Sequence, residues 1–139
     1  MNITGPIRQL LTANAPFTAL VGTKVFAEVI EQETVLPAVA LRVIDIQPGT
    51  FKNGVATVDT VILQVDVYAK AGSTSGMQQV ETISEAARTV LDRYAGTVTV
   101  SGTPYIIQGC HFSGIAPLPF DIEDDVYRRA SQYKIRYVR

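Results

Sequence analysis

The fold is decided by residues 57–69, which have the sequence TVDTVILQVDVYA. Apolar residues occupy every second position along this stretch, namely Val61, Leu63, Val65 and Val67. The positions between them hold Ile62, Gln64, Asp66 and Tyr68. Alternation with a period of two is typical of a strand that packs one face against a core. Residues 57–69 therefore predict a strand in a sheet that is covered on one side.

A second strand is predicted just before this one. It begins at Pro37 and carries three apolar residues on one face, namely Val39, Leu41 and Val43. Residues 47–55, between the two strands, are rich in turn-forming residues, namely Pro48, Gly49, Asn53 and Gly54. We therefore expect a long antiparallel hairpin. Residues 24–30 predict a shorter strand that precedes it.

Two helices are predicted, one before and one after these three strands. Residues 4–14 place Ile7, Leu10 and Leu11 at the i, i+3, i+4 spacing of a helix. Residues 75–94 form a longer helix with one apolar stripe along its length. The apolar residues that follow the first helix predict only a short turn closed by a glycine; they are Phe17, Leu20, Val21 and Gly22.

Three further strands complete the chain. Residues 97–100 and 105–110 predict a second hairpin, and residues 126–138 predict the last strand. Gly109 and Gly114 are expected to mark bulges. The order α-β-β-β-α-β-β-β predicts an α+β fold in two layers. We expect a mainly antiparallel sheet of about five to six strands with two helices on one face, in a single domain that spans the whole chain.

The composition limits the classes of function. The 139 residues are 47% hydrophobic and 18% charged, and the net charge is −1. This composition argues against a disordered chain and gives no general attraction to nucleic acid or anionic lipid. Residues 1–11 lack the apolar core of a signal peptide, and no stretch reaches the roughly 18 apolar residues of a membrane-spanning helix. We therefore expect a soluble protein with no membrane partner.

The sequence contains no recognisable catalytic, cofactor-binding or metal-binding motif. Cys110 and His111 are the only cysteine and the only histidine. As neighbours in a strand they should point to opposite faces of the sheet and so should not form a reactive pair. An acidic cluster lacks the residue spacing of a calcium-binding loop; its members are Asp121, Glu123, Asp124 and Asp125. We expect no enzyme activity, no cofactor and no metal site.

The acidic cluster directly precedes a strand that is rich in basic residues, namely Arg128, Arg129, Lys134, Arg136 and Arg139. Tyrosines alternate with these residues, so we expect an amphipathic strand with tyrosines against the core, without direct nucleic-acid binding. Opposite charges in two separate patches could bring copies of the chain together head to tail, in a ring if the rotation closes. The two patches could equally neutralise each other within one chain.

The chain resembles the small tail-completion or tail-terminator proteins of long-tailed bacteriophages. Residues 20–26 (LVGTKVF) and 36–43 (LPAVALRV) follow the first helix in the arrangement typical of that family. Residues 64–69 (QVDVYA), followed by the helix over residues 75–94, match its central strand and helix. The last strand also fits the family, because polar and aromatic residues alternate along it.

This resemblance implies a structural protein of the virion, with no catalysis and no cofactor. Proteins of this kind form rings, commonly hexameric, on the last ring of tail-tube subunits. They stop growth of the tube and create the surface that joins the tail to the head connector. The implied partners are further copies of the chain, the tail-tube protein and the head–tail connector protein. The implied location is the head-proximal end of the virion tail, after assembly in the host cytoplasm.

Contacts with partners are expected on exposed loops, because a sheet holds such loops in fixed positions. The candidates are Phe51 and Lys52 in the loop over residues 48–55, and Leu118 and Phe120 in the loop over residues 117–125. Alternative functions are those of a different head–tail connector, such as a stopper or neck protein, or of a minor tail protein. A small ligand-binding domain or enzyme would need a polar pocket with converging side chains, and the sequence shows no such set.

Overall fold

The structure is a computed structural model that describes residues 3–28, 35–49, 58–70, 76–116 and 126–138. These ranges contain three helices and six strands. The helices are α1 (Thr4–Thr12), α2 (Ala15–Val21) and α3 (Gly76–Leu91). The strands are β1 (Val25–Ala27), β2 (Ala38–Pro48), β3 (Val58–Lys70), β4 (Gly96–Val100), β5 (Thr103–Ala116) and β6 (Val126–Val138).

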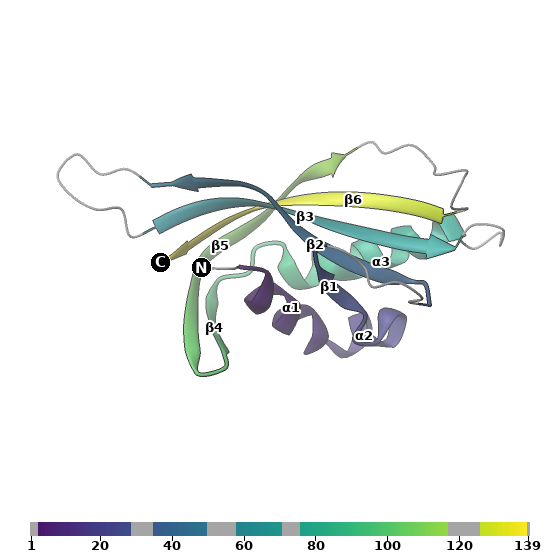
Figure 1. The fold of residues 1–139 in the computed structure, drawn as a ribbon, viewed down its shortest axis with the longest axis horizontal. Coiled ribbons are helices and arrows are strands. Elements are labelled where there is room, and N and C mark those ends of the chain that lie inside the picture. The colour runs from purple at the N-terminus through teal and green to yellow at the C-terminus, as the bar shows by residue number, and fades with distance from the viewer. Residues whose placement is uncertain (1–2, 29–34, 50–57, 71–75, 117–125, 139) are drawn as a thin grey trace.

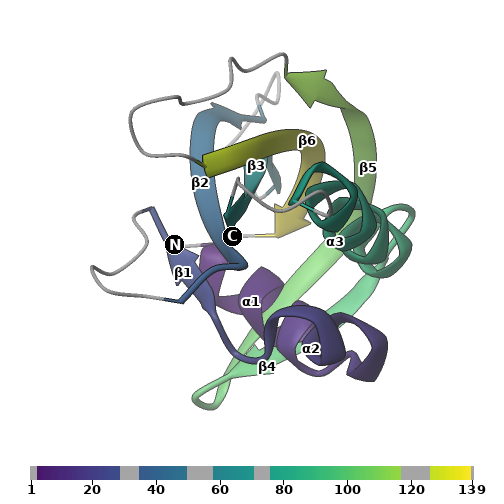
Figure 2. The same cartoon turned by 90° about the vertical axis from the view of Figure 1, so that its right-hand side faces the viewer.

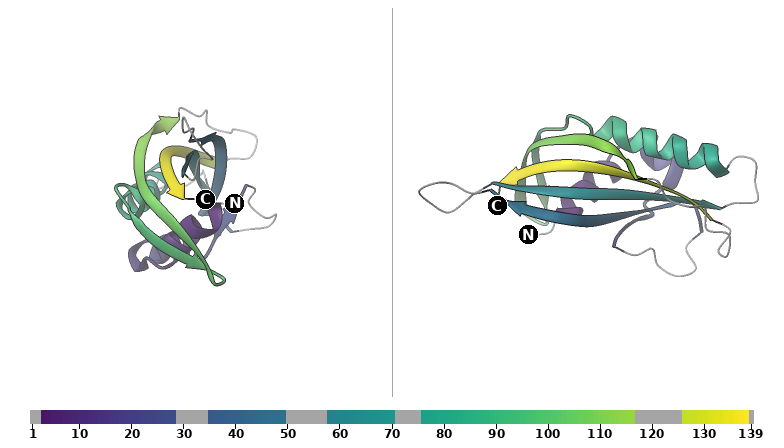
Figure 3. Two further views of the ribbon diagram at one scale, coloured as in Figure 1. Left: turned by 90° about the vertical axis from the view of Figure 1, so that its left-hand side faces the viewer. Right: turned by 90° about the horizontal axis from the view of Figure 1, so that it is seen from above.

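All six strands belong to one sheet in the order β1-β2-β3-β6-β5-β4. The pairing of β1 with β2 is parallel, and every other pairing is antiparallel. The helices lie together on one side of the sheet (Figure 1), and the sheet is strongly curled (Figure 2). Seen from above, the long strands run side by side along the molecule (Figure 3). The predicted α+β class, with a mainly antiparallel sheet and helices on one face, is confirmed.

The strand predicted from residues 57–69 is the central strand β3. It pairs with β6 along its whole length, from Val58 opposite Val138 to Lys70 opposite Val126. Its alternating apolar residues are all buried in the core, as predicted: Val61, Leu63, Val65 and Val67. The tyrosines of β6 also pack into the core, because Tyr133 is fully buried and Tyr137 nearly so.

The two predicted bulges are present in β5. Its register with β6 shifts between Ile107 and Gly109 and again between Phe112 and Gly114. Gly114 has φ +151, a conformation that L side chains rarely adopt. The extra residues bend β5, which helps the sheet to curl around the core.

Both predicted helices are present, as α1 and α3, but the segment expected to be a short apolar turn forms a third helix, α2. The side chain of Asn14 caps this helix by accepting a hydrogen bond from the backbone N–H of Phe17, at 3.0 Å. Pro16 occupies the first turn, where a missing N–H costs nothing. Gly22 ends the helix with φ +63. Phe17 and Val21 face the core, so this short helix adds a third piece to the helical layer.

The C-terminal end of α3 is fixed to β5 by two backbone groups of the strand. The N–H of Arg93 donates to the carbonyl oxygen of Cys110, at 2.6 Å. The carboxylate of Asp92 accepts from the N–H of Phe112, at 3.0 Å. Arg88 also stacks its guanidinium over the Phe112 ring, 4.0 Å from the ring centre. These contacts cover the middle of the outer edge of β5.

Candidate functional site

The helix-free face of the sheet carries a buried polar network. It is centred on Asp66, on the central strand β3, whose side chain is fully buried. Its two neighbours in the register are alanines, Ala40 on β2 and Ala130 on β6. Because these side chains are small, longer side chains from the adjacent positions can reach the Asp66 carboxylate.

Two arginines meet this carboxylate from the strands on either side. A guanidinium nitrogen of Arg128, on β6, lies 2.8 Å from Asp66 Oδ2 and donates a hydrogen bond to it. Arg42, on β2, lies 3.8 Å from the same oxygen. The other oxygen of Asp66 accepts a hydrogen bond from the Gln64 amide at 2.8 Å, and Gln64 in turn accepts one from the Gln132 amide at 3.2 Å. Asp66 therefore holds both guanidinium groups in place on this face.

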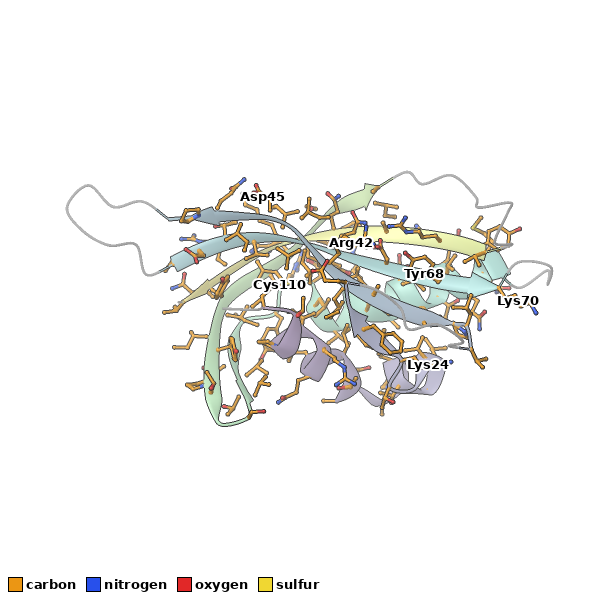
Figure 4. All side chains as sticks on the ribbon, in the orientation of Figure 1. Lys24, Arg42, Asp45, Tyr68, Lys70 and Cys110 are labelled. Carbon is orange, nitrogen blue, oxygen red and sulfur yellow. The ribbon has the colours of Figure 1, made fainter. Side chains whose placement is uncertain are left out.

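Tyr68 extends the network along β3. Arg128 lies opposite it in the register and places its guanidinium 5.4 Å from the centre of the Tyr68 ring. Burial raises the pKa of Tyr68 above its ordinary value, and the Asp66 carboxylate adds to the rise, while Arg128 and Arg42 oppose it. The phenol therefore stays neutral at physiological pH. Figure 4 labels both Tyr68 on β3 and Arg42 on β2, which stands opposite Gln64 in the register.

Among the described strand residues, basic side chains outnumber acidic ones on the helix-free face. The register places five basic side chains on it, namely Arg42, Lys70, Arg128, Lys134 and Arg136. Its acidic side chains in the described strands are Asp45 and Asp66. Lys134 and Arg136 are exposed to solvent. A fixed, positively charged sheet face is a surface that fits an acidic partner.

Two of the residues predicted to make protein contacts are in the described part of the chain, and they point to opposite faces. Arg128 belongs to the network on the helix-free face. Arg129 faces the helices and pairs with Glu81 of α3, at 3.3 Å. The other predicted contact residues lie outside the described residues: Phe51, Lys52, Leu118, Phe120, Asp121, Glu123, Asp124 and Asp125.

The lone cysteine and histidine do not form a reactive pair. Cys110 is buried in the core, whereas the neighbouring His111 is exposed, as their adjacent positions in a strand predict. Burial raises the pKa of the Cys110 thiol to about 12, and the nearby Asp92 adds to the rise. The thiol is therefore protonated at neutral pH and unsuited to nucleophilic attack.

The described ranges contain no cluster of three or more histidine, cysteine or acidic side chains that could hold a metal ion. None of their helices has the length and apolar character needed to cross a membrane.

The network on the helix-free face was not predicted from the sequence. Its members are Arg42, Gln64, Asp66, Tyr68, Arg128 and Gln132, and of these only Arg128 was a predicted contact residue. The available signal was the run of polar residues at alternate positions of β3, which shows a polar face but does not reveal its partners. The partners come from β2 and β6, and their register with β3 is set by the whole sheet.

Comparison with known proteins gives a family and a related fold. The sequence model of the family described as "Tail completion protein gp17" matches residues 5–137. A comparison with curated protein sequences finds no match. Among solved structures, the chain is similar to one from the "Virion of native gene transfer agent (GTA) particle", with a TM-score of 0.78 and 20% sequence identity. The alignment covers 99% of this chain and 95% of that one, and it shows that the two share a fold.

Proposed function

We propose that this chain, which belongs to the tail completion protein gp17 family, closes the end of a tail tube as a ring and provides the surface that joins the tail to the head. Family membership makes it a structural component of a phage-type tail and not an enzyme, as the sequence predicts. The family match over residues 5–137 carries the proposal, because it covers all the described helices and strands except the first residue of α1 and the last residue of β6.

The proposed partners are further copies of the chain, the tail-tube protein and the head–tail connector protein. A ring of six copies is the arrangement that the resemblance implies. Such a ring would have one face that matches the symmetry of the tube and another that the connector can bind. The proposed location is the head-proximal end of the tail, reached after assembly in the host cytoplasm.

The helix-free face supports a role in binding another protein. Asp66 is a fully buried carboxylate that engages arginines from two different strands. Removing a carboxylate from water is costly unless its partners are well placed, so the strands must hold this arrangement firmly. The result is a basic surface of defined shape, which favours an acidic partner surface over nonspecific contact.

The proposal is tested by growing tail tubes from purified tail-tube protein with and without this chain. We expect shorter tubes as the amount of chain increases, with a gold-labelled chain at one end of each tube in electron micrographs. A variant in which Lys134 and Arg136 are both replaced by glutamate tests the basic face, and a Thr97→Glu, Thr99→Glu variant adds the same new carboxylates on β4, two strands away in the sheet. Tubes of unchanged length, or label on the portal side of heads and not on tubes, would reject capping and favour a stopper.

A further inference from the structure

Two edges of the sheet are left without a strand partner in the described residues, and they lie at opposite sides. On one side, β1 pairs with β2 only as far as Leu41, so β2 continues alone from Arg42 to Pro48. On the other side, β4 pairs with β5 only over the residues Thr103 to Ile107 of β5. Unpaired strand edges present backbone donors and acceptors that can bind another chain.

The hydrogen bonds of β2 show which of its residues face the free edge. The N–H of Val39 donates to the carbonyl oxygen of Lys24, which lies just before β1. The carbonyl oxygen of Leu41 accepts from the N–H of Glu28, which lies just after β1. The register shift between Val43 and Asp45 moves this orientation by one residue. Beyond it, the Gly49 N–H donates to Val58 at the end of β3. By the period of two, Ile46 therefore directs its N–H and carbonyl toward the free edge.

The outer edge of β5 is occupied up to Phe112. The carbonyl of Cys110 and the N–H of Phe112 are both taken by the end of α3. After the register shift between Phe112 and Gly114, Ile115 stands opposite Ser131 of β6. By the same alternation, Ile115 directs its N–H and carbonyl away from β6 and toward the free edge.

Ile46 and Ile115 match each other in exposure and in face. Their side chains are 51% and 46% exposed. Ile46 stands opposite Val61 on β3, and Ile115 stands opposite Ser131 on β6, so both register positions belong to the helix side of the sheet. An exposed isoleucine beside an unpaired backbone N–H and carbonyl is the combination that favours pairing with another strand.

The directions of the strands also match. Three successive antiparallel pairings separate β2 from β5, so the two strands run in opposite directions. A second copy placed alongside with its helices on the same side would therefore bring its β5 antiparallel to β2 of the first copy. Pro48, which has no N–H to donate, would end this ladder just beyond Ile46.

We propose that the chain assembles head to tail by pairing the free edge of β2 in one copy with the free edge of β5 in the next, with Ile46 opposite Ile115. This inference rests on the ring of the proposed function and names the contact that builds it. Both halves of the contact are present on one chain, so the occupant is a second copy. The contact is heterologous, and such contacts form a ring when the rotation closes.

The pairing also fixes a stagger between neighbours. Within one copy, Ile46 is level with Cys110 of β5 through Val61 and Ile135. Pairing with Ile115 shifts the neighbour by about four ladder positions, or about 13 Å at roughly 3.3 Å per residue. A closed sheet requires its strands to be tilted and its register to be staggered, so this shift is of the kind that closure needs.

Cysteine cross-linking tests the contact. In a Cys110→Ala background, the double variant Ile46→Cys, Ile115→Cys should form disulfides between copies, because paired residues of this type have Cα atoms about 5.5 Å apart. A non-reducing gel should show a ladder of multiples that ends at the ring. Each single-cysteine variant should stay monomeric on the same gel. Cross-linking of either single variant would overturn the head-to-tail pairing.

Assembly of the unsubstituted chain, measured by light scattering, separates the two proposals. If the unsubstituted chain assembles and the double variant gives no ladder, the edge pairing is wrong and the ring survives. If neither assembly nor a ladder is seen, with or without tail tubes, both are wrong.

A backbone variant gives an independent test. Ile46→Pro removes the N–H that faces the free edge and leaves the hydrogen bonds to β3 in place. We expect association roughly tenfold weaker or more, while Ile46→Val, which keeps the N–H, stays close to the unsubstituted chain. Circular dichroism should show that both variants fold. Unchanged association of the folded Ile46→Pro variant would overturn the proposal.

Discussion

Replacing Asp66 by asparagine should destabilise the chain far more than the same change at an exposed aspartate. Asp66 is fully buried and accepts a hydrogen bond from Arg128 and one from Gln64, each at 2.8 Å. The substitution keeps the size of the side chain, so no cavity forms. It removes the negative charge between two arginines and leaves one amide oxygen where the carboxylate supplied two.

The expected loss follows from the exposure of the two arginines. Removing one member of a fully buried ion pair costs about 3–5 kcal/mol. Here Arg128 and Arg42 are 26% and 39% exposed, so water can compensate part of the lost attraction. We therefore expect a decrease of about 2 kcal/mol in the free energy of unfolding, because one hydrogen bond to a charged group is lost and two like charges remain. For a chain of this size, that corresponds to a melting temperature lower by roughly 6 °C.

The matched control is Asp45→Asn. Asp45 is exposed on β2, where it accepts a hydrogen bond from the Gln47 amide at 3.0 Å. An exposed contact of this kind should change the free energy of unfolding by no more than about 0.5 kcal/mol. Urea unfolding followed by circular dichroism measures both variants. Equal losses at the two positions, or a loss at Asp66 within about 0.5 kcal/mol of zero, would show that the network does not hold the helix-free face.

Three further predictions concern packing, capping and titration. Gly76→Ala should lower the free energy of unfolding by about 1–3 kcal/mol, because an added Cβ would lie 2.7 Å from a backbone oxygen. Gly5→Ala, whose added Cβ has its nearest contact at 3.9 Å, should leave that free energy unchanged or raise it. Urea unfolding measures both variants. Equal effects of the two would refute the close approach. Asn14→Ala should lower the free energy of unfolding by about 1 kcal/mol, because α2 loses its N-terminal cap. An unchanged urea midpoint would refute this role of Asn14. Burial raises the pKa of the Cys110 thiol in the folded chain to about 12. The neutral thiol therefore favours the folded state fully below the ordinary thiol pKa, and this contribution to the free energy of unfolding is lost as pH rises toward 12. Between about pH 9 and 11, the free energy of unfolding should therefore fall less for Cys110→Ala than for the unsubstituted chain. Parallel pH profiles of the two proteins would contradict this.

Local sequence patterns were sufficient for the elements that repeat a simple period. The alternation in residues 57–69 predicted β3, and Gly109 and Gly114 predicted both bulges of β5. The helix α2 was missed because a seven-residue helix is too short for its period to stand out. Its one clear local signal was Asn14, a residue that caps helices, placed two residues before Pro16.

The features that depend on strand register could not be predicted from local sequence patterns. Asp66 could be placed on a polar face, but its contact with Arg128 arises from the pairing of β3 with β6, which is far away in the sequence. Its contact with Arg42 depends on the exact register of β2 with β3, which the predicted hairpin alone does not fix. The same holds for the free edges at Ile46 and Ile115. They are defined by where β1 and the end of α3 stop covering the sheet, and that depends on the packing of the whole chain.

The most direct test of the proposed function is electron microscopy of particles made without this chain. The proposed role predicts tails of uncontrolled length, or tails that are not joined to heads. Supplying the unsubstituted chain should restore tails of uniform length on heads. Normal tails of uniform length on normal heads, in particles that lack the chain, would contradict the role in ending the tail tube and joining it to the head.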